Sequence, residues 1–320
     1  MNNKFYIGAD IGGTKCAVLL AKTYENTEKP VILGKKTIKT EGTPAETLKK
    51  LFVLVEELLN ENGNPATESV GIACGGPLDA ERGVILSPPN LRGWDEVHVC
   101  ELFTERFGVP ARLGNDADAG ALAEWKFGAG RGCRNMIFLT FGTGLGAGLI
   151  LNGKLYRGAN GNAGEIGHVR LRPHGPIGYG KEGSAEGFCS GGGIARLAAI
   201  RAENNPAAFP LLDSVNGDKS AITAKIVAEA AVAGDPFCTA VFNECGEMLG
   251  ETLAVLTDLF NPERIVLGGV FMRSEKLLRP AMEKTLRAEA LPASLSVLRV
   301  LPAALGESIG DYAALSLATE

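Results

Sequence analysis

Two stretches of this chain have the same form, an apolar run, a glycine turn and a second apolar run. They are KFYIGADIGGTKCAVLLA, residues 4–21, and NMIFLTFGTGLGAGLILNGKLY, residues 135–156. Apolar β-rich runs joined by glycine turns indicate β-hairpins. Because one hairpin opens each half of the chain, we expect two related lobes. The likeness between the halves is too loose to indicate a duplication.

Helical patterns alternate with further strands. Thr43 and Glu46 form a capping box before an apolar helical stretch, and Asp235-Pro236 begins a long helix that ends near Asn261-Pro262. Further helices are expected over residues 96–108, 116–130 and 306–318, and strands over 110–115, 264–269 and 296–303.

This mixture predicts an α/β protein, and 320 residues favour two lobes. We expect a first lobe over residues 1–118 and a second over 119–304, with the final helix, about 305–320, packing back onto the first. A cleft between the lobes is the expected ligand site.

Composition excludes several classes of partner. The net charge is −5 and no lysine- or arginine-rich block is present, so neither nucleic acid nor an anionic membrane surface is an expected partner. No signal-type segment or membrane span is apparent. The seven cysteines are scattered without a CxxC pair, which favours reduced, mostly buried thiols in a cytoplasmic protein.

The glycine turns do not fit the two commonest nucleotide motifs. In GADIGGTK the order is Gly-Thr-Lys before a strand, which is not a P-loop, and GTGLGAG is followed by a strand rather than the helix of a dinucleotide fold. The remaining interpretation is a phosphate-binding turn whose backbone amides face phosphate oxygens. The alternative for either turn alone is an ordinary tight hairpin. The candidate residues are Gly12, Gly13, Thr14, Gly142, Thr143 and Gly144.

Two charged residues flank the first turn. A carboxylate beside phosphates is repulsive unless a cation lies between them, so Asp10 predicts Mg²⁺ bound through water. Lys15 either neutralises phosphate charge or is a solvated strand lysine.

Taken together, the motifs resemble those of the ROK (repressor, ORF, kinase) family, within the actin-like, ribonuclease H-like ATPase superfamily. The resemblance covers nearly the whole chain, through DIGGTK, PPNLRGW, GND, FGTGLGAG, GEIGH and VLGGV in that order. It implies a two-lobed fold that binds ATP and Mg²⁺ in the interlobe cleft and phosphorylates a hexose, usually at the 6-hydroxyl. Gly268 and Gly269 are then expected near the adenine.

The resemblance also assigns the sugar site. Asp116 matches the catalytic base; the alternative from the residues alone is a helix N-cap, the commoner role of Asp at such a position. Asp118 is expected to be a solvated acid of the first helical turn. The implied sugar-binding residues are Asn90, Asn115, Asp116, Glu165, His168 and Glu186. Their ordinary alternatives are a turn asparagine, solvated glutamates and a structural histidine.

One segment departs from the family pattern. Many relatives carry three cysteines after the histidine that bind structural zinc with it. This chain has Ile177, Tyr179 and Ser184 at those positions, and Cys189 alone cannot complete a site, so we expect no zinc. Packing of Ile177 or a hydrogen bond from Tyr179 is the expected substitute for holding His168.

The predicted function is an ATP-dependent hexokinase of glucokinase type. N-acetylmannosamine, N-acetylglucosamine, mannose and fructose remain alternative substrates, because pocket shape decides among them. A sugar-sensing repressor is disfavoured, since only nine residues precede Asp10, and a chaperone-type ATPase is disfavoured because no client-binding domain follows the last helix. A homodimer is expected.

Overall fold

A computed structural model describes residues 3–24 and 29–320. The chain divides into two compact units. Unit 1 comprises Met1–Gly132, Leu155–Asn162 and Ala304–Glu320, and unit 2 comprises Cys133–Lys154 and Ala163–Ala303. These units differ from the predicted lobes over residues 119–132 and over Leu155–Asn162, which both group with unit 1.

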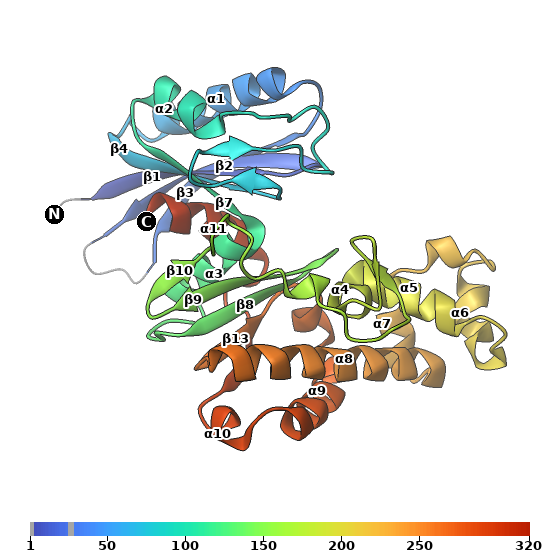
Figure 1. Cartoon of the computed structure of the whole chain (residues 1–320). Helices are drawn as coiled ribbons and strands as arrows, with labels where there is room; N and C mark the ends of the chain where they lie inside the picture. Colours follow the sequence, from blue (N-terminus) through green and yellow to red (C-terminus); the bar gives the residue numbers. More distant parts are fainter. Residues whose placement is uncertain (1–2, 25–28) are drawn as a thin grey trace. The chain divides into compact units, whose positions relative to one another are not determined.

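Unit 1 is built on a five-stranded sheet in the order β3-β2-β1-β4-β7 (Figure 1). The first three strands pair antiparallel, whereas β4 and β7 run parallel to β1. The strands are β1 (Lys4–Ile11), β2 (Lys15–Thr23), β3 (Val31–Lys39), β4 (Thr67–Cys74) and β7 (Ala111–Asn115), with a small ladder of β5 (Leu78–Asp79) and β6 (Val84–Ile85). The helices are α1 (Pro44–Glu61), α2 (Val99–Phe107), α3 (Asp116–Phe127) and α11 (Ile309–Ala318), preceded by a 3₁₀ turn over Gly306–Ser308.

Helices cover both faces of this sheet. Successive side chains of a strand point to opposite faces, so each strand contributes to two cores. Val18 and Leu20 of β2 belong to a core with Leu51 of α1 and Phe103 of α2. On the other face, the intervening Leu19 and Ala21 pack with Ala123 of α3 and Leu315 of α11. The final helix, although distant in sequence, is therefore part of the core of unit 1.

Local sequence signals predicted the start of α1 but not the start of α2. The Thr43–Glu46 capping box of α1 is present, as predicted. The helix predicted from residue 96 instead starts at Val99. The prediction was wrong there because Val97 is held in an isolated bridge, with its N–H donating to Ile85 O at 3.0 Å and its own O accepting from Ile85 N at 2.9 Å.

The sheet of unit 2 repeats the arrangement of strands, in the order β10-β9-β8-β13-β14. The hairpin of β8 and β9 is antiparallel, and β13 and β14 run parallel to β8. The strands are β8 (Met136–Phe141), β9 (Leu145–Leu151), β10 (Lys154–Tyr156), β13 (Arg264–Leu267) and β14 (Arg299–Pro302), with a small hairpin of β11 (Ile177–Gly178) and β12 (Lys181–Glu182). The two glycine hairpins seen in the sequence are therefore the β1–β2 pair of the first sheet and the β8–β9 pair of the second.

The helices of unit 2 lie mainly in its second half. They are α4 (Ala185–Phe188), α5 (Gly191–Arg201), α6 (Phe209–Ser214), α7 (Ala224–Val232), α8 (Pro236–Phe260), α9 (Val270–Glu289) and α10 (Pro292–Leu295), with 3₁₀ turns at Ile166–His168, Pro206–Ala208 and Lys219–Ala221. The long helix α8 has Asp235 as its N-cap and ends before Asn261, as predicted. The sequence patterns did not predict α5, α7 or α9.

The mixed α/β class is confirmed. All seven cysteines are free, and six of them are buried. Within the described part of the chain, no helix combines the length and the apolar character needed to cross a membrane.

Candidate active site

The parallel pairing in unit 1 aligns the carboxyl ends of three strands. Ile11 of β1 lies opposite Cys74 of β4, and Cys74 lies opposite Asn115 of β7. The chain therefore leaves all three strands at one edge of the sheet, where ligands of open α/β sheets bind. Asp10 and Asp116 come to this edge from strands that are not neighbours in the sequence.

The first glycine turn is held at both ends by Thr40. The N–H of Thr40 donates to Thr14 O at 3.0 Å, and its hydroxyl donates to Gly12 O at 2.5 Å. The turn also closes on itself, since Gly12 N donates to Lys15 O at 3.2 Å. These bonds fix the backbone of Gly12–Thr14, while Gly13, Thr14 and Lys15 remain exposed.

The same turn lies against the predicted sugar-binding loop. A Cβ at position 13 would fall 2.2 Å from Asn90 O, so only glycine fits there. Asn90 itself is exposed. Unit 1 thus brings the first phosphate motif and Asn90 into direct contact.

The start of α3 excludes the N-cap role considered for Asp116. Asn115 is the N-cap, and its Oδ1 accepts from Asp118 N at 2.8 Å. Asp116 is the first helical residue, and its side chain is exposed. The protein surrounding this carboxyl nevertheless raises its pKa above the ordinary value by desolvation. The cap role belongs to Asn115, which leaves the Asp116 carboxylate available to a ligand.

Asp10 is half-buried beside this group. Desolvation, together with the nearby carboxylates of Asp116 and Asp311, raises the pKa of Asp10 from 3.8 to about 6, although Lys35 and Lys15 oppose the shift. Because the two lysines only partly offset the clustered carboxylates, the site favours either a proton or a further cation. Oxygen ligands of this kind suit Mg²⁺, so Asp10 fits the predicted metal position.

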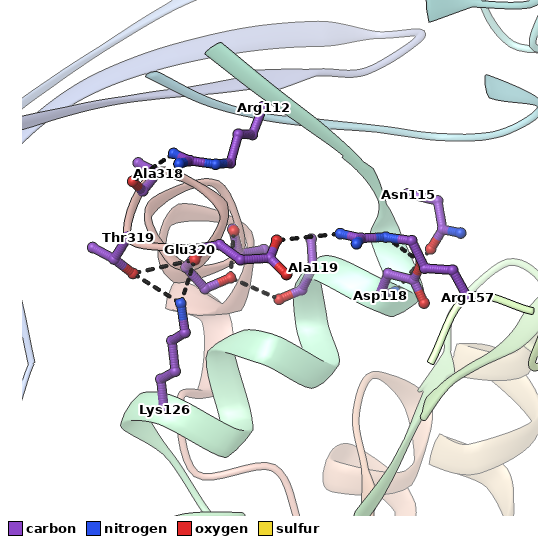
Figure 2. Close-up of polar contacts among 11 residues, drawn as sticks. Arg112, Asn115, Asp118, Ala119, Lys126, Arg157, Ala318, Thr319 and Glu320 are labelled. Atoms are coloured by element: carbon purple, nitrogen blue, oxygen red, sulfur yellow. Dashed lines mark hydrogen bonds and ion pairs between the residues drawn. The ribbon is translucent and has the colours of Figure 1, made fainter. Parts of the chain in front are cut away.

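The expectation for Asp118 was wrong. It is buried rather than solvated, and its Oδ2 lies 3.8 Å from Arg157 Nε. Figure 2 shows Arg157 between Asp118 and Glu320, with Arg157 Nη2 donating to Glu320 Oε2 at 3.2 Å. Arg157 follows β10 and is distant in sequence from α3, so no local pattern could reveal the pair.

Unit 2 gathers the second phosphate motif with two other predicted groups. The turn closes through Gly142 N, which donates to Gly144 O at 3.0 Å, and Leu145 N donates to Glu186 Oε2 at 3.1 Å. A Cβ at position 269 would lie 2.0 Å from Phe141 O, and the φ of Gly269 is +60°. Gly268 N donates to Leu139 O at 3.0 Å. The second turn, Glu186 and the Gly268-Gly269 pair are therefore neighbours.

The GEIGH segment packs against the same hairpin. Ala147 N of β9 donates to Gly164 O at 3.0 Å, and a Cβ at Gly167 would lie 2.1 Å from Leu145 O. The segment forms a 3₁₀ turn that leaves Glu165 and His168 exposed. Both predicted sugar ligands are accessible from solvent.

Comparison with known proteins agrees with these motifs. The model of the ROK family matches residues 6–320. The chain belongs to the ROK family. The glucokinase of Halalkalibacterium halodurans is 34% identical over 317 residues, covering 97% of this chain and 93% of that protein. The NagC transcriptional regulator of Escherichia coli is 33% identical over 251 residues, covering 77% of this chain and 59% of that protein.

A solved ROK structure shares the fold. The glucokinase of Streptomyces griseus in complex with glucose and AMPPNP is 33% identical, with a TM-score of 0.74 over 98% of this chain and 99% of that one. The actin-like α/β fold expected from the motifs is confirmed.

The segment at the family's zinc position is ordered by other contacts. Ser184 is buried and caps α4, its hydroxyl accepting from Gly187 N at 3.2 Å. Lys181 Nζ donates to His168 O at 2.8 Å, and the Tyr179 ring meets the His168 ring edge-on with centroids 6.4 Å apart. Ile177 is exposed and does not pack inward as suggested. Among the described residues no group of three or more His, Cys, Asp or Glu side chains could hold a metal ion.

Two features of this ROK protein had no sequence prediction. Thr40 lies 26 residues beyond the turn that it holds, and only the pairing of β2 with β3 brings it there. The first residues of α5 contact the second turn, with Gly191 N donating to Gly142 O at 2.8 Å. A Ser190 N-cap before three glycines was the signal that could have revealed this helix.

Proposed function

We propose that this ROK protein is an ATP-dependent glucokinase that phosphorylates the 6-hydroxyl of glucose. The observation that carries the proposal lies at the start of α3, where Asn115 caps the helix and the Asp116 carboxylate stays accessible, close enough to Asp10 to raise the pKa of that residue. Glucokinases that match along 97–98% of this chain support the choice of reaction and sugar.

Asp116 is the proposed general base. A sugar hydroxyl is too weak an acid to ionise in the ground state, but its proton becomes acidic as its oxygen bonds to the γ-phosphorus. As that bond forms, the bond from phosphorus to the ADP oxygen breaks and the proton passes to Asp116. An ionised Asp116 also orients the hydroxyl for in-line attack.

The remaining residues position the two substrates. The backbone amides of Gly13 and Thr14, and of Thr143 and Gly144, are suited to phosphate oxygens, because those of Gly12 and Gly142 already donate within the turns. Lys15 is a further cation, and Gly268-Gly269 lie toward the adenine. Mg²⁺ held near Asp10 through water would neutralise phosphate charge when ATP is bound. Sugar hydroxyls donate and accept, so they are suited to the amides and carboxylates of Asn90, Asn115, Glu165 and Glu186, with His168.

The decisive experiment measures ADP release with ATP, Mg²⁺ and a panel of hexoses and N-acetylhexosamines. For the wild type, glucose should give the highest kcat/KM. Asp116→Asn should lower kcat by about 10²–10⁴-fold, the usual contribution of a positioned base. Asp213→Asn is a matched control, because Asp213 lies on α6 outside the site, and it should leave turnover unchanged. Full activity of Asp116→Asn would exclude the assigned base.

The finer properties are part of the same proposal. N-acetylhexosamines, mannose and fructose are the alternative substrates, and preferential turnover of one of them in the panel would replace glucose. We expect the protein to be cytoplasmic and to form a homodimer. Light scattering tests the homodimer. A DNA-binding role is weaker, because the relation to the NagC regulator covers only 59% of that protein.

A further inference from the structure

The structure has a cavity in unit 1 that the proposed kinase reaction does not use. Its volume is about 490 Å³, within the range of small-molecule sites. The lining comes from the turn between β5 and β6, from the edge strand β7, and from Arg157 and Glu320. Cys100 and Leu113 supply apolar surface, while Glu81, Arg82 and Arg112 add charge.

Arg112 is the least satisfied cation of this cavity. A guanidinium has five N–H donors, yet among the described residues Arg112 makes one hydrogen bond, from Nη1 to Ala318 O at 3.5 Å. No ion pair to it is found within the described ranges. By contrast, Arg82 already contacts Glu96 Oε1 at 3.2 Å. A half-buried arginine without a carboxylate partner favours an anion that comes from solution.

Arg157 is a second, independent indication that the cavity binds an anion. Its Nε is buried and donates no hydrogen bond within the part of the chain that the structure describes, because the Asp118 oxygen lies 3.8 Å away. Its Nη2 contacts Glu320, which also lines the cavity. Arg157 is therefore held loosely between two carboxylates (Figure 2).

We propose that this cavity binds a small hydroxylated phosphomonoester, with its phosphate on Arg112 and Arg157. Two guanidiniums match the charge and the forked geometry of a phosphate. Glu81 and Glu320 would repel a bare polyanion, but they accept hydrogen bonds from the hydroxyl groups of the same ligand. The mixed lining thus selects a phosphorylated polyol or sugar over inorganic phosphate.

The site is coupled to the catalytic segment through Arg157. A phosphate that attracts this side chain weakens its ion pair with the buried Asp118, whose N–H is bound by the Asn115 cap next to Asp116. Weakening an ion pair of a buried carboxylate is unfavourable, so occupancy of the cavity disturbs the start of α3. We expect the bound ligand to lower kcat; this step rests on the proposed glucokinase function.

Binding is tested without turnover, by calorimetry on the full chain with glucose 6-phosphate and with inorganic phosphate. We expect glucose 6-phosphate to bind the wild type at least tenfold more tightly than phosphate. Arg112→Met should weaken that binding by about tenfold or more, as loss of a charge-assisted pair requires. Arg106→Met, which removes an exposed arginine outside the cavity, should not change it. Arg112→Lys keeps the charge without the fork and should weaken binding less than Met does.

Several results would overturn the proposal. Binding by Arg112→Met equal to the wild type would place glucose 6-phosphate elsewhere, for example at the catalytic site as product. Equal affinities for phosphate and glucose 6-phosphate would refute the role of the two glutamates. In kinetics, glucose 6-phosphate should lower kcat at saturating glucose and ATP in the wild type but not in Arg112→Met. Failure of glucose turnover refutes the glucokinase alone, because the binding result stands without it.

Discussion

At the scale of single residues, Asp10 shows how function opposes stability. Its pKa is raised to about 6, so the folded protein disfavours the ionised form that Mg²⁺ requires. Ionisation of Asp10 therefore lowers the free energy of unfolding as the pH rises from 3.8 through about 6. The cost is part of the site, since an uncharged residue would fit the same place better.

Asp10→Asn should stabilise the protein at pH 7.5 while abolishing kinase activity. Each pKa unit corresponds to about 1.4 kcal/mol, and partial exposure reduces the full effect, so we expect a gain of about 1–3 kcal/mol. Denaturant unfolding at several pH values measures it. Below about pH 4 the aspartate is protonated and resembles asparagine, so the gain should disappear. An equal gain at pH 4 and pH 7.5 would contradict this origin.

At the scale of elements, the first phosphate turn depends on the end of β3. Thr40→Val removes the hydroxyl bond to Gly12 O but keeps the shape of the side chain. One net hydrogen bond is worth about 0.5–1.5 kcal/mol, so KM for ATP should rise about 3–10-fold with KM for glucose nearly unchanged. Thr40→Ser keeps the hydroxyl and should restore most of the affinity. A similar defect in both variants would mean that packing, not the hydrogen bond, is responsible.

A second element is the segment around α4, which we expect hydrogen bonds rather than zinc to order. Ser184 caps α4 at a position where many relatives have a zinc-binding cysteine. We therefore expect EDTA, followed by restored Mg²⁺, to leave both activity and melting temperature unchanged. Ser184→Ala should cost about 0.5–2 kcal/mol, the usual loss of an N-cap. Stoichiometric zinc in the purified protein, measured by metal analysis, would contradict this prediction.

At the scale of the whole molecule, unit 1 is closed by residues from the end of the chain. Helix α11 packs so tightly on β4 that a Cβ at Gly71 would lie 1.9 Å from Ala314 O. Gly71→Ala should lower the free energy of unfolding by about 1–3 kcal/mol or more, because backbone must move. Gly34→Ala on β3 is the matched control. Its Cβ meets only the flexible end of Leu58 at 2.7 Å and should cost less. Equal losses would show that α11 adapts freely.

Local sequence determined the parts of this protein that depend on neighbouring residues. The two glycine hairpins, the capping box of α1 and the limits of α8 follow from turn and capping chemistry within a few positions, and the motif order was enough to indicate the family. The two hairpins indicated two related lobes, but they did not determine the strand order that the two sheets share.

Only the tertiary structure decided which of several neighbouring residues has a given role. Asn115, not Asp116, caps α3, although both residue types cap helices well. The buried Asp118 faces Arg157, which follows β10, and Thr40 reaches Gly12 only through strand pairing. Such roles depend on contacts between segments far apart in the chain, whose geometry is set by packing and by the register of the sheet, and no local pattern encodes either.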